Sequence, residues 1–357
     1  MRARLLLPVL VVVSFAYTGA AHAQQRGQGP QPILMECGTH ADVEIICGTH
    51  SPEDLELAPD GRSVVVSQMG GLDSSARGEI ALFDPAKKSF TKMTIIEEPL
   101  KDWGVPACPG PVGDKLAPHG VSLSRRSGGA TQLYVVNHGS RESIEMFEVK
   151  QAEGSLRLMW HGCVLAKDAY NDVATLPDGG FAATHPTSLG IKGNGIFSGQ
   201  PSGVVARWAP GKGETELAGT KAGFPNGIVA GADGRYLYYA AWTAKEVHKY
   251  DLEAGIEIGV VKLDFMPDNL TWTKKRQILA AGVKGTQGDC PSGSGAPCIQ
   301  GFGVAVIDPG KMRAKKVFDS QGKGALISGV SVALQVKDSV YIGSFQGNRL
   351  LRIRWKE

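Results

Sequence analysis

A polar-start hairpin recurs six times along the chain and strongly limits what the chain can fold into. Each copy opens with a polar residue, continues as an apolar strand, turns, and returns as a second strand. Turns such as Pro59-Asp60-Gly61 between alternating strands are typical of β-hairpins. The six copies start at Glu53, His119, Asn171, Asn226, Asp268 and Ser328, between 42 and 66 residues apart.

A second hairpin follows each of the first five copies, as in Gly78–Ile95, and a single strand, Asn348–Trp355, follows the sixth. Two hairpins make a four-stranded blade, and repeats of this length are typical of β-propellers. The sequence therefore predicts an all-β, six-bladed β-propeller over residues 37–357. We expect the strand-like Val43–Cys47 to complete the last blade and close the ring, which removes two exposed sheet edges. A Greek-key β-sandwich is the alternative, and the regular pairing of hairpins favours the propeller.

The N-terminus has the features of a cleavable secretory signal at residues 1–23. Basic Arg2 and Arg4 precede an apolar run, Leu5–Tyr17, and small residues flank His22 in Ala21-His22-Ala23. The run is short for a membrane span, and the alternative is a membrane anchor. We expect residues 24–36, rich in Gln, Gly and Pro, to be a flexible lead-in. The prediction is an exported protein, secreted or periplasmic, without a membrane span.

Charge and cysteine content narrow the function classes further. The formal net charge of +3 falls to +1 once Arg2 and Arg4 leave with the signal, which argues against a nucleic-acid partner. Six cysteines in an exported chain indicate disulfides. We expect Cys290 to pair with Cys298 across a short Gly/Ser/Pro loop. The remaining four cysteines allow three connectivities: Cys37, Cys47, Cys108 and Cys163.

The polar starts of the repeats predict a metal site. The innermost strand of each blade lines the propeller axis, so starts at the same end converge on one mouth. Carboxylate and amide oxygens dominate these starts, Asn269 adds another, and such oxygens suit Ca²⁺. Adjacent strand residues face opposite ways, so Asp54 and Asp172 are candidates for a second, deeper site. The alternative is that these polar residues only satisfy turn backbones.

The same stretches resemble the serum paraoxonase/arylesterase family, within the gluconolactonase-like six-bladed propellers. The matching segments run in order from Glu53 to Asn269: Pro52-Glu53-Asp54-Leu55, Pro118-His119-Gly120-Val121-Ser122, Val135-Val136-Asn137-His138, Asn171-Asp172-Val173, Phe224-Pro225-Asn226-Gly227-Ile228 and Asp268-Asn269-Leu270. The resemblance implies hydrolysis of lactones and aryl esters and a pair of histidines, His119 and His138. It also implies two Ca²⁺ ions. The catalytic ion would be held by Glu53, Asn171, Asn226, Asp268 and Asn269, and the structural ion by Asp54, Asp172 and a main-chain carbonyl near Val121.

These residues lead to a mechanistic hypothesis. Ca²⁺ would polarise the substrate carbonyl, His119 would act as general base on water, and His138 would orient it or relay the proton. Residues that follow inner strands or flank ligands are candidates to line a pocket for a small lactone or ester: Met69, His185, Phe224, Trp242 and Phe345. Two alternatives stay open, a sugar lactonase of the gluconolactonase type and a non-enzymatic, Ca²⁺-stabilised binding module.

The chain also departs from the family pattern. No cysteine follows Cys298, so the family's disulfide between the N- and C-terminal regions cannot form. The segment Gly190–Gly203 is rich in glycine where the family has a more apolar active-site segment. These departures bear on substrate preference rather than on the metal ligands.

Overall fold

The structure is a computed structural model that describes residues 33–70, 77–152, 154–191, 193–285 and 301–355. The chain divides into two compact units, Met1–Ile33 and Leu34–Glu357, and only Ile33 of the first unit is described. The expected signal peptide, most of the expected lead-in, and the expected Cys290–Cys298 disulfide lie outside the described residues. No helix in the described part of the chain is long and apolar enough to cross a membrane.

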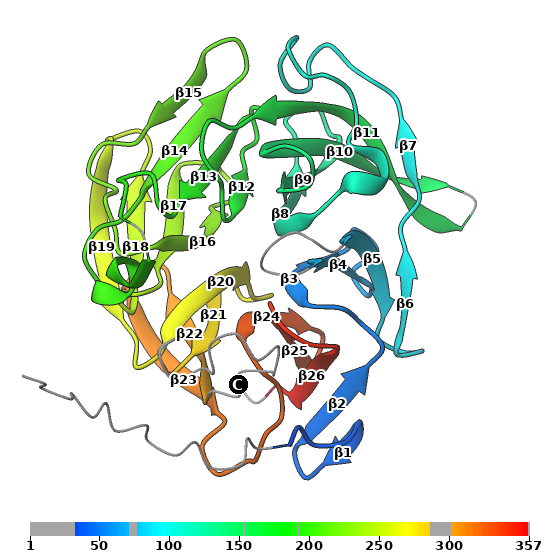
Figure 1. Ribbon diagram of the computed structural model, residues 1–357, viewed down its shortest axis with the longest axis vertical. Helices are drawn as coiled ribbons and strands as arrows, with labels where there is room; N and C mark the ends of the chain where they lie inside the picture. The colour runs from blue at the N-terminus through cyan, green and yellow to red at the C-terminus, as the bar shows by residue number, and fades with distance from the viewer. Residues whose placement is uncertain (1–32, 71–76, 153, 192, 286–300, 356–357) are drawn as a thin grey trace, which may run out of the picture. The chain divides into compact units, whose positions relative to one another are not determined.

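The second unit is a ring of six sheets, each built on four antiparallel strands, which confirms the predicted six-bladed propeller (Figure 1). The blades are numbered in chain order, and each is traced from its innermost to its outermost strand. Blade 1 consists of β3 (Pro52–Leu57), β4 (Val64–Gln68), β5 (Glu79–Asp84) and β6 (Ser89–Lys92). Blade 2 consists of β8 (Pro118–Arg125), β9 (Thr131–Asn137), β10 (Ser143–Ala152) and β11 (Ser155–Leu165). Blade 3 consists of β12 (Val173–Thr175), β13 (Phe181–His185), β14 (Val204–Ala209) and β15 (Gly213–Glu216).

Blades 4 to 6 repeat this layout. Blade 4 consists of β16 (Pro225–Ala230), β17 (Tyr236–Ala241), β18 (Glu246–Asp251) and β19 (Ile256–Lys262). Blade 5 consists of β20 (Met266–Trp272), β21 (Ile278–Val283), β22 (Phe302–Asp308) and β23 (Arg313–Asp319). Blade 6 consists of β24 (Val330–Val336), β25 (Ser339–Ser344), β26 (Arg349–Arg354) and β2 (Val43–Cys47). Helical structure within the described ranges is limited to two 3₁₀ turns, η1 (Gly113–Lys115) and η2 (Gly193–Ser198).

The N-terminal strand closes the ring as predicted. β2 pairs antiparallel with β26, from Val43 opposite Ile353 to Cys47 opposite Arg349. A short strand, β1 (Gly38–His40), pairs with β2 and adds a fifth strand to blade 6. A Cys37–Cys47 disulfide joins the two ends of this hairpin. The closure pairs the edge of β26 with the edge of β2, and both edges would otherwise be exposed.

Blade 2 also has a fifth strand. β7 (Ile95–Glu97) leaves blade 1 and pairs in parallel with the outermost strand of blade 2, β11. The Cys108–Cys163 disulfide ties the long connection after β7 to the same strand β11. Of the three connectivities open to Cys37, Cys47, Cys108 and Cys163, the structure therefore has Cys37–Cys47 with Cys108–Cys163.

The core lies between neighbouring blades, so the inner strands are buried on both faces. In β17, Leu237 and Tyr239 pack in a cluster with blade 3, whereas Tyr238 and Ala240 pack in a cluster with blade 5. Successive residues of a strand point to opposite faces, which explains why such strands read as continuous apolar runs. The innermost strands contact one another in sequence around the ring, β3 to β8, β12, β16, β20, β24 and back to β3.

A register shift marks the start of the innermost strand in five blades. It follows Pro52, Pro118, Pro225, Pro267 and Val330, each of which pairs with the last residue or the next to last of the second strand. Such a bulge inserts an extra residue and re-aims the side chains beside it. The residue after each pairing residue therefore occupies an equivalent place: Glu53, His119, Asn226, Asp268 and Ser331. In blade 6 this residue is Ser331, so the expected start at Ser328 was three residues too early.

Candidate functional site

The polar starts of the inner strands meet at one end of the ring axis. The side-chain amide of Asn269 donates to Glu53 Oε1 at 2.8 Å, which joins blade 5 to blade 1. Ser331 Oγ of blade 6 donates to the main-chain carbonyl of Glu53 at 2.6 Å. On the other side, His119 Nε2 of blade 2 lies 3.7 Å from Glu53 Oε1. Glu53 is therefore the centre of a cluster built from at least four blades.

Four side-chain oxygens among the polar starts of the inner strands are buried without a hydrogen-bond partner among the described residues. Burying a polar atom without a partner is unfavourable, and folded proteins rarely leave several such atoms together. An orphaned group of acceptors is what a bound cation would satisfy. The four atoms are Glu53 Oε2, Asn171 Oδ1, Asn226 Oδ1 and Asn269 Oδ1.

The raised pKa values of the buried carboxyl groups also favour a cation site. The pKa of Glu53 is raised well above its ordinary value, chiefly by burial and then by the charges of Asp54, Asp268 and Asp172. Burial likewise raises the pKa of Asp268. Within the described part of the chain, no group of three or more His, Cys, Asp or Glu side chains is arranged to hold a metal ion. A cation at this site would therefore depend on the amide oxygens as much as on the carboxylates, a donor set that suits Ca²⁺ better than Zn²⁺.

Asp54 and Asp172 lie beside the cluster and connect neighbouring blades. Asp54 Oδ2 accepts a hydrogen bond from the N–H of Val121 in blade 2 at 2.7 Å. Asp172 Oδ2 accepts one from the N–H of Ile228 in blade 4, also at 2.7 Å. Burial raises the pKa of Asp54 to about 7, and raises that of Asp172 well above its ordinary value with Asp54 as a further cause. The structure thus brings Asp54, Asp172 and Val121 together around the axis.

Two glycines make this close approach possible. A Cβ on Gly120 would lie 2.1 Å from Asp172 Oδ1, and a Cβ on Gly227 would lie 2.4 Å from the Cα of Asn269. Gly120 follows His119, and Gly227 follows Asn226. At the matching position, blades 1, 3 and 5 have Asp54, Asp172 and Asn269. Large polar residues and glycine therefore alternate from blade 1 to blade 5, and blade 6 has Val332 at this position.

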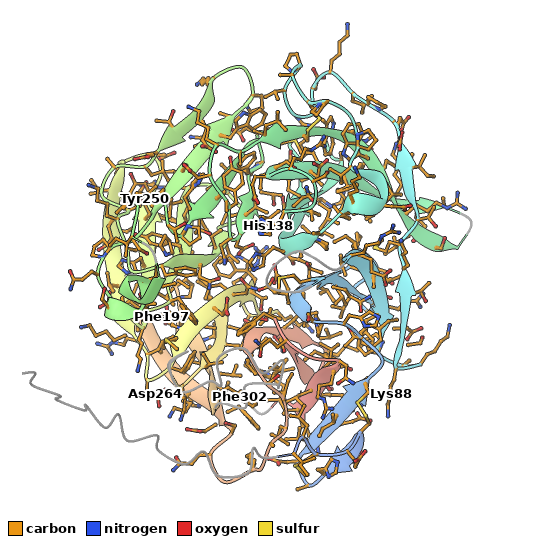
Figure 2. All side chains as sticks on the ribbon, viewed as in Figure 1. Lys88, His138, Phe197, Tyr250, Asp264 and Phe302 are labelled. Carbon is orange, nitrogen blue, oxygen red and sulfur yellow. A yellow bond between two sulfur atoms is a disulfide. The ribbon has the colours of Figure 1, made fainter. Side chains whose placement is uncertain are left out.

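The two candidate histidines are in contact. His119 Nδ1 lies 2.9 Å from His138 Nε2, and His138 Nδ1 lies 2.7 Å from Glu142 Oε2. Burial, followed by the neighbouring His138, lowers the pKa of His119 to about 3. His119 is therefore a neutral ring at pH 7, with its Nε2 atom facing Glu53. Figure 2 places His138 near the centre of the ring, on the inner side of the blades.

Several candidate pocket residues occupy one equivalent position. In each of five blades, one residue of the second strand pairs with the start of the innermost strand. The residues that come directly after it are Met69, His138, Trp242, Val283 and Phe345. The ring of Phe224 lies 5.4 Å from that of Trp242, and the ring of Phe197 lies 5.8 Å from it. Trp242 and Val283 pack in one cluster with Phe197 and Phe224. The apolar residues at the position of His138, together with Phe224, are called the apolar rim below.

His185 occupies a different place. It is the last residue of β13 and pairs with Val204 of β14, and its ring lies 4.5 Å from that of Tyr170. Its Nε2 lies 3.5 Å from Glu214 Oε1 on the outermost strand, β15. The structure therefore places His185 in a local cluster with Tyr170 and Glu214, apart from the position shared by Met69, Trp242 and Phe345.

Sequence reasoning did not identify Val283, Phe197 or Glu142. The repeat register could have identified Val283, because it follows Gly282 as Trp242 follows Ala241. Phe197 lies in the Gly-rich segment and meets Trp242 only through the fold. Glu142 lies in the loop between β9 and β10, and the matching loops of blades 4 and 6 have no glutamate, so the repeats contain no signal for it.

Comparison with known proteins links this arrangement to one group of sequences. No protein-family model matches the chain. The chain is 26% identical to mouse serum paraoxonase/arylesterase 1 over 236 residues, which span 61% of the chain and 62% of that protein. It is 25% identical to human serum paraoxonase/lactonase 3, with 82% of each protein covered, and 25% identical to the rabbit protein of the same name, with 96% and 97% covered. The resemblance to the serum paraoxonases therefore extends over nearly the whole chain.

Solved structures share the fold. A gluconolactonase from Xanthomonas campestris superposes with a TM-score of 0.51 at 16% identity, covering 93% of this chain and 99% of the other. A luciferin-regenerating enzyme gives a TM-score of 0.51 at 13% identity, with 88% and 97% covered. At these identities the likeness concerns the fold alone, and it agrees with the six-bladed ring.

Proposed function

We propose that this chain is an exported, calcium-dependent hydrolase of lactones and aryl esters. The observation that carries the proposal is that four buried, unpartnered oxygens and a pair of contacting histidines belong to the polar starts of the inner strands. The relatives named as paraoxonases, arylesterases and lactonases support the same reaction class. The disulfides Cys37–Cys47 and Cys108–Cys163 fit an oxidising compartment, secreted or periplasmic.

The residues present fit two Ca²⁺ ions. The first would be held by oxygens of Glu53, Asn171, Asn226, Asp268 and Asn269. The second, which would stabilise the fold, would be held by Asp54, Asp172 and the main chain at Val121. When bound, the first ion supplies Lewis-acid polarisation of the ester carbonyl and stabilises the negative charge that develops on its oxygen.

The protein's own groups supply the base and the pocket. His119, neutral and with Nε2 toward Glu53, accepts a proton from the attacking water, and His138 receives the proton that His119 gives up at Nδ1. The apolar rim of Met69, Phe224, Trp242 and Phe345 contacts the aryl or alkyl part of the substrate. His185, next to Tyr170, is a more remote candidate for substrate contact.

A substrate panel with and without chelator tests the proposal. We expect hydrolysis of an aryl acetate and of alkyl δ-lactones, loss of turnover in EDTA, and its return with added Ca²⁺. His119→Ala should lower kcat by about 100-fold, whereas His40→Ala on β1 should leave kcat unchanged. Turnover that survives complete removal of Ca²⁺ would refute the calcium mechanism.

The same panel decides between the proposal and its alternatives. The shared fold with a gluconolactonase favours including sugar lactones. Preference for a sugar lactone over both aryl esters and alkyl lactones would reassign the chain as a sugar lactonase. Absence of turnover on every member in Ca²⁺-saturated protein would favour a binding module.

A further inference from the structure

A loop between the second and third strands of blade 2 extends the histidine pair by one carboxylate. His138 opens this loop and Glu142 closes it, and Glu142 Oε2 lies 2.7 Å from His138 Nδ1. The His138 side chain is only 15% exposed and the Glu142 side chain 36% exposed. Glu53, His119, His138 and Glu142 therefore form a continuous line from the axis to the protein surface.

The partners along this line fix the direction of every hydrogen bond. An ionised carboxylate only accepts, so His138 Nδ1 must carry the proton it shares with Glu142. A neutral His138 then has an unprotonated Nε2, which accepts from His119 Nδ1–H. His119 Nε2 is left as the acceptor that faces the mouth. We propose that Glu142 is a positioning residue that selects this tautomer of His138, and through it presents the basic nitrogen of His119.

Buried contacts hold the loop in this conformation. The side-chain amide of Asn137 donates to the carbonyls of Gly139 at 3.1 Å and Arg141 at 2.9 Å, and its oxygen accepts from the N–H of Gly139 at 3.1 Å. Arg141 forms an ion pair of 2.7 Å with Glu145, whose side chain is fully buried. Glu145 also accepts from Trp160 Nε1 at 2.8 Å. A mobile ion pair on the surface would contribute little to positioning His138. The Glu142 carboxylate is instead held next to His138 by a fixed backbone.

Two backbone features show that the loop permits little change. A Cβ on Gly139 would lie 1.7 Å from the carbonyl oxygen of Lys115, so only glycine fits there. Ser140 has a φ of 60°, in the left-handed region that few L-residues adopt. The loop is therefore built to one conformation, and that conformation directs Glu142 to His138.

The inference rests on the proposed function, and the proton balance of the reaction is complete without a further reactant. Water oxygen bonds to the ester carbonyl carbon while one of its protons moves to His119 Nε2. The Nδ1 proton of His119 moves to His138 Nε2, and the resulting imidazolium is paired with the Glu142 carboxylate. The protons return as the C–O bond breaks and the departing alkoxide becomes an alcohol, leaving a carboxylic acid and two neutral rings.

A double-mutant cycle in the full Ca²⁺-loaded chain tests the role. Glu142→Ala should lower kcat for an aryl acetate by about tenfold with KM within twofold, and Glu142→Gln should fall between this variant and wild type. In a His138→Gln background, Glu142→Ala should cause no further loss. Glu216→Ala, at an exposed carboxylate on β15, is the control. An unchanged kcat in Glu142→Ala, or an equal loss in both backgrounds, overturns the proposal.

Imidazole ¹⁵N NMR provides a measurement that does not depend on turnover. Wild type should show His138 protonated at Nδ1, assigned by comparison with His138→Gln, and Glu142→Ala should lose this single tautomer. A His138 protonated at Nε2 in wild type, or one unaffected by Glu142→Ala, refutes the proposal. If wild type hydrolyses no substrate, the proposed function fails, and the spectrum alone then decides whether Glu142 sets the tautomer.

Discussion

The side-chain amide of Asn269 donates to the carboxylate of Glu53 at 2.8 Å, across 216 positions of sequence. This one contact joins the first and fifth blades at the axis. It also uses the amide nitrogen of Asn269 in a way that leaves the amide oxygen buried and unpartnered. The contact thus directs a neutral oxygen into a cluster where a further carboxylate would add charge repulsion.

The orphaned amide oxygens predict a calcium-dependent gain in stability. Calcium at 100 times its dissociation constant should raise the free energy of unfolding by about 2.7 kcal/mol. Asn226→Ala removes one unpartnered oxygen, so it should lose most of this gain while its Tm in EDTA stays close to that of wild type. Thermal unfolding with and without Ca²⁺ measures both effects, with the exposed Asn348→Ala as the control. An equal calcium-induced rise in Tm for Asn226→Ala and wild type would remove Asn226 from the ligand set.

Gly227 and Gly120 should tolerate no side chain. A Cβ at Gly227 would overlap the backbone of Asn269, and the two strands would have to separate. We expect Gly227→Ala to lower the free energy of unfolding by about 3 kcal/mol or to prevent folding. Gly128→Ala is the matched control, because a Cβ there meets nothing within 4 Å. Urea unfolding of the two variants compares them, and equal stability would show that the blades relax readily at the axis.

The two disulfides should stabilise the chain unequally. Cys108–Cys163 closes a loop with a sequence separation of 55, and Cys37–Cys47 closes one of 10. Chain entropy predicts losses of about 4 and about 3 kcal/mol when each pair is replaced by alanine. Urea unfolding of the two double variants measures the losses. A larger loss for Cys37–Cys47 would indicate that ring closure through β2, rather than chain entropy, dominates.

The fold was predictable because its signal is repeated. Each blade carries the same alternation and turn residues, so errors in one copy, such as Ser328 in place of Ser331, do not change the reading of the others. The closing strand Val43–Cys47 was also predictable, since blade 6 lacked its outermost strand. Repetition could not give the fifth strand β7, which pairs across blades and has no counterpart elsewhere.

The site was predictable only where it follows the repeat. Glu53, Asn171, Asn226 and Asp268 share one position, and their convergence follows from the ring. Glu142 and Phe197 lie in loops whose sequences do not repeat between blades, and their contacts with His138 and Trp242 depend on three-dimensional loop conformation. The pairing of Cys108 with Cys163 likewise depends on the path of a long connection that carries no periodic pattern.

Asp319 should contribute stability that depends on pH. Hydrogen bonds and ion pairs with Lys284 and Lys316 hold the pKa of this carboxyl well below its ordinary value. A lowered pKa in the folded state stabilises the fold above about pH 4, the ordinary value, and this contribution is lost as pH falls toward the folded-state pKa. Asp319→Asn should therefore lower the free energy of unfolding at pH 7 by up to about 1 kcal/mol, and by less than that near pH 2. Urea titrations at the two pH values, with the exposed Asp338→Asn as control, test this; an equal effect at both would contradict it.

The apolar rim should set substrate size. Trp242 is 8% exposed and Val283 1% exposed, and they occupy equivalent places in adjacent blades. Enlarging the rim with Trp242→Ala removes aromatic contact, so kcat/KM for an aryl acetate should fall by about tenfold or more while that for a small aliphatic lactone changes less. Tyr236→Ala, at the far end of the same strand β17, controls for loss of aromatic packing. Equal losses on both substrates in Trp242→Ala would mean that Trp242 supports the fold of the mouth and does not contact the substrate.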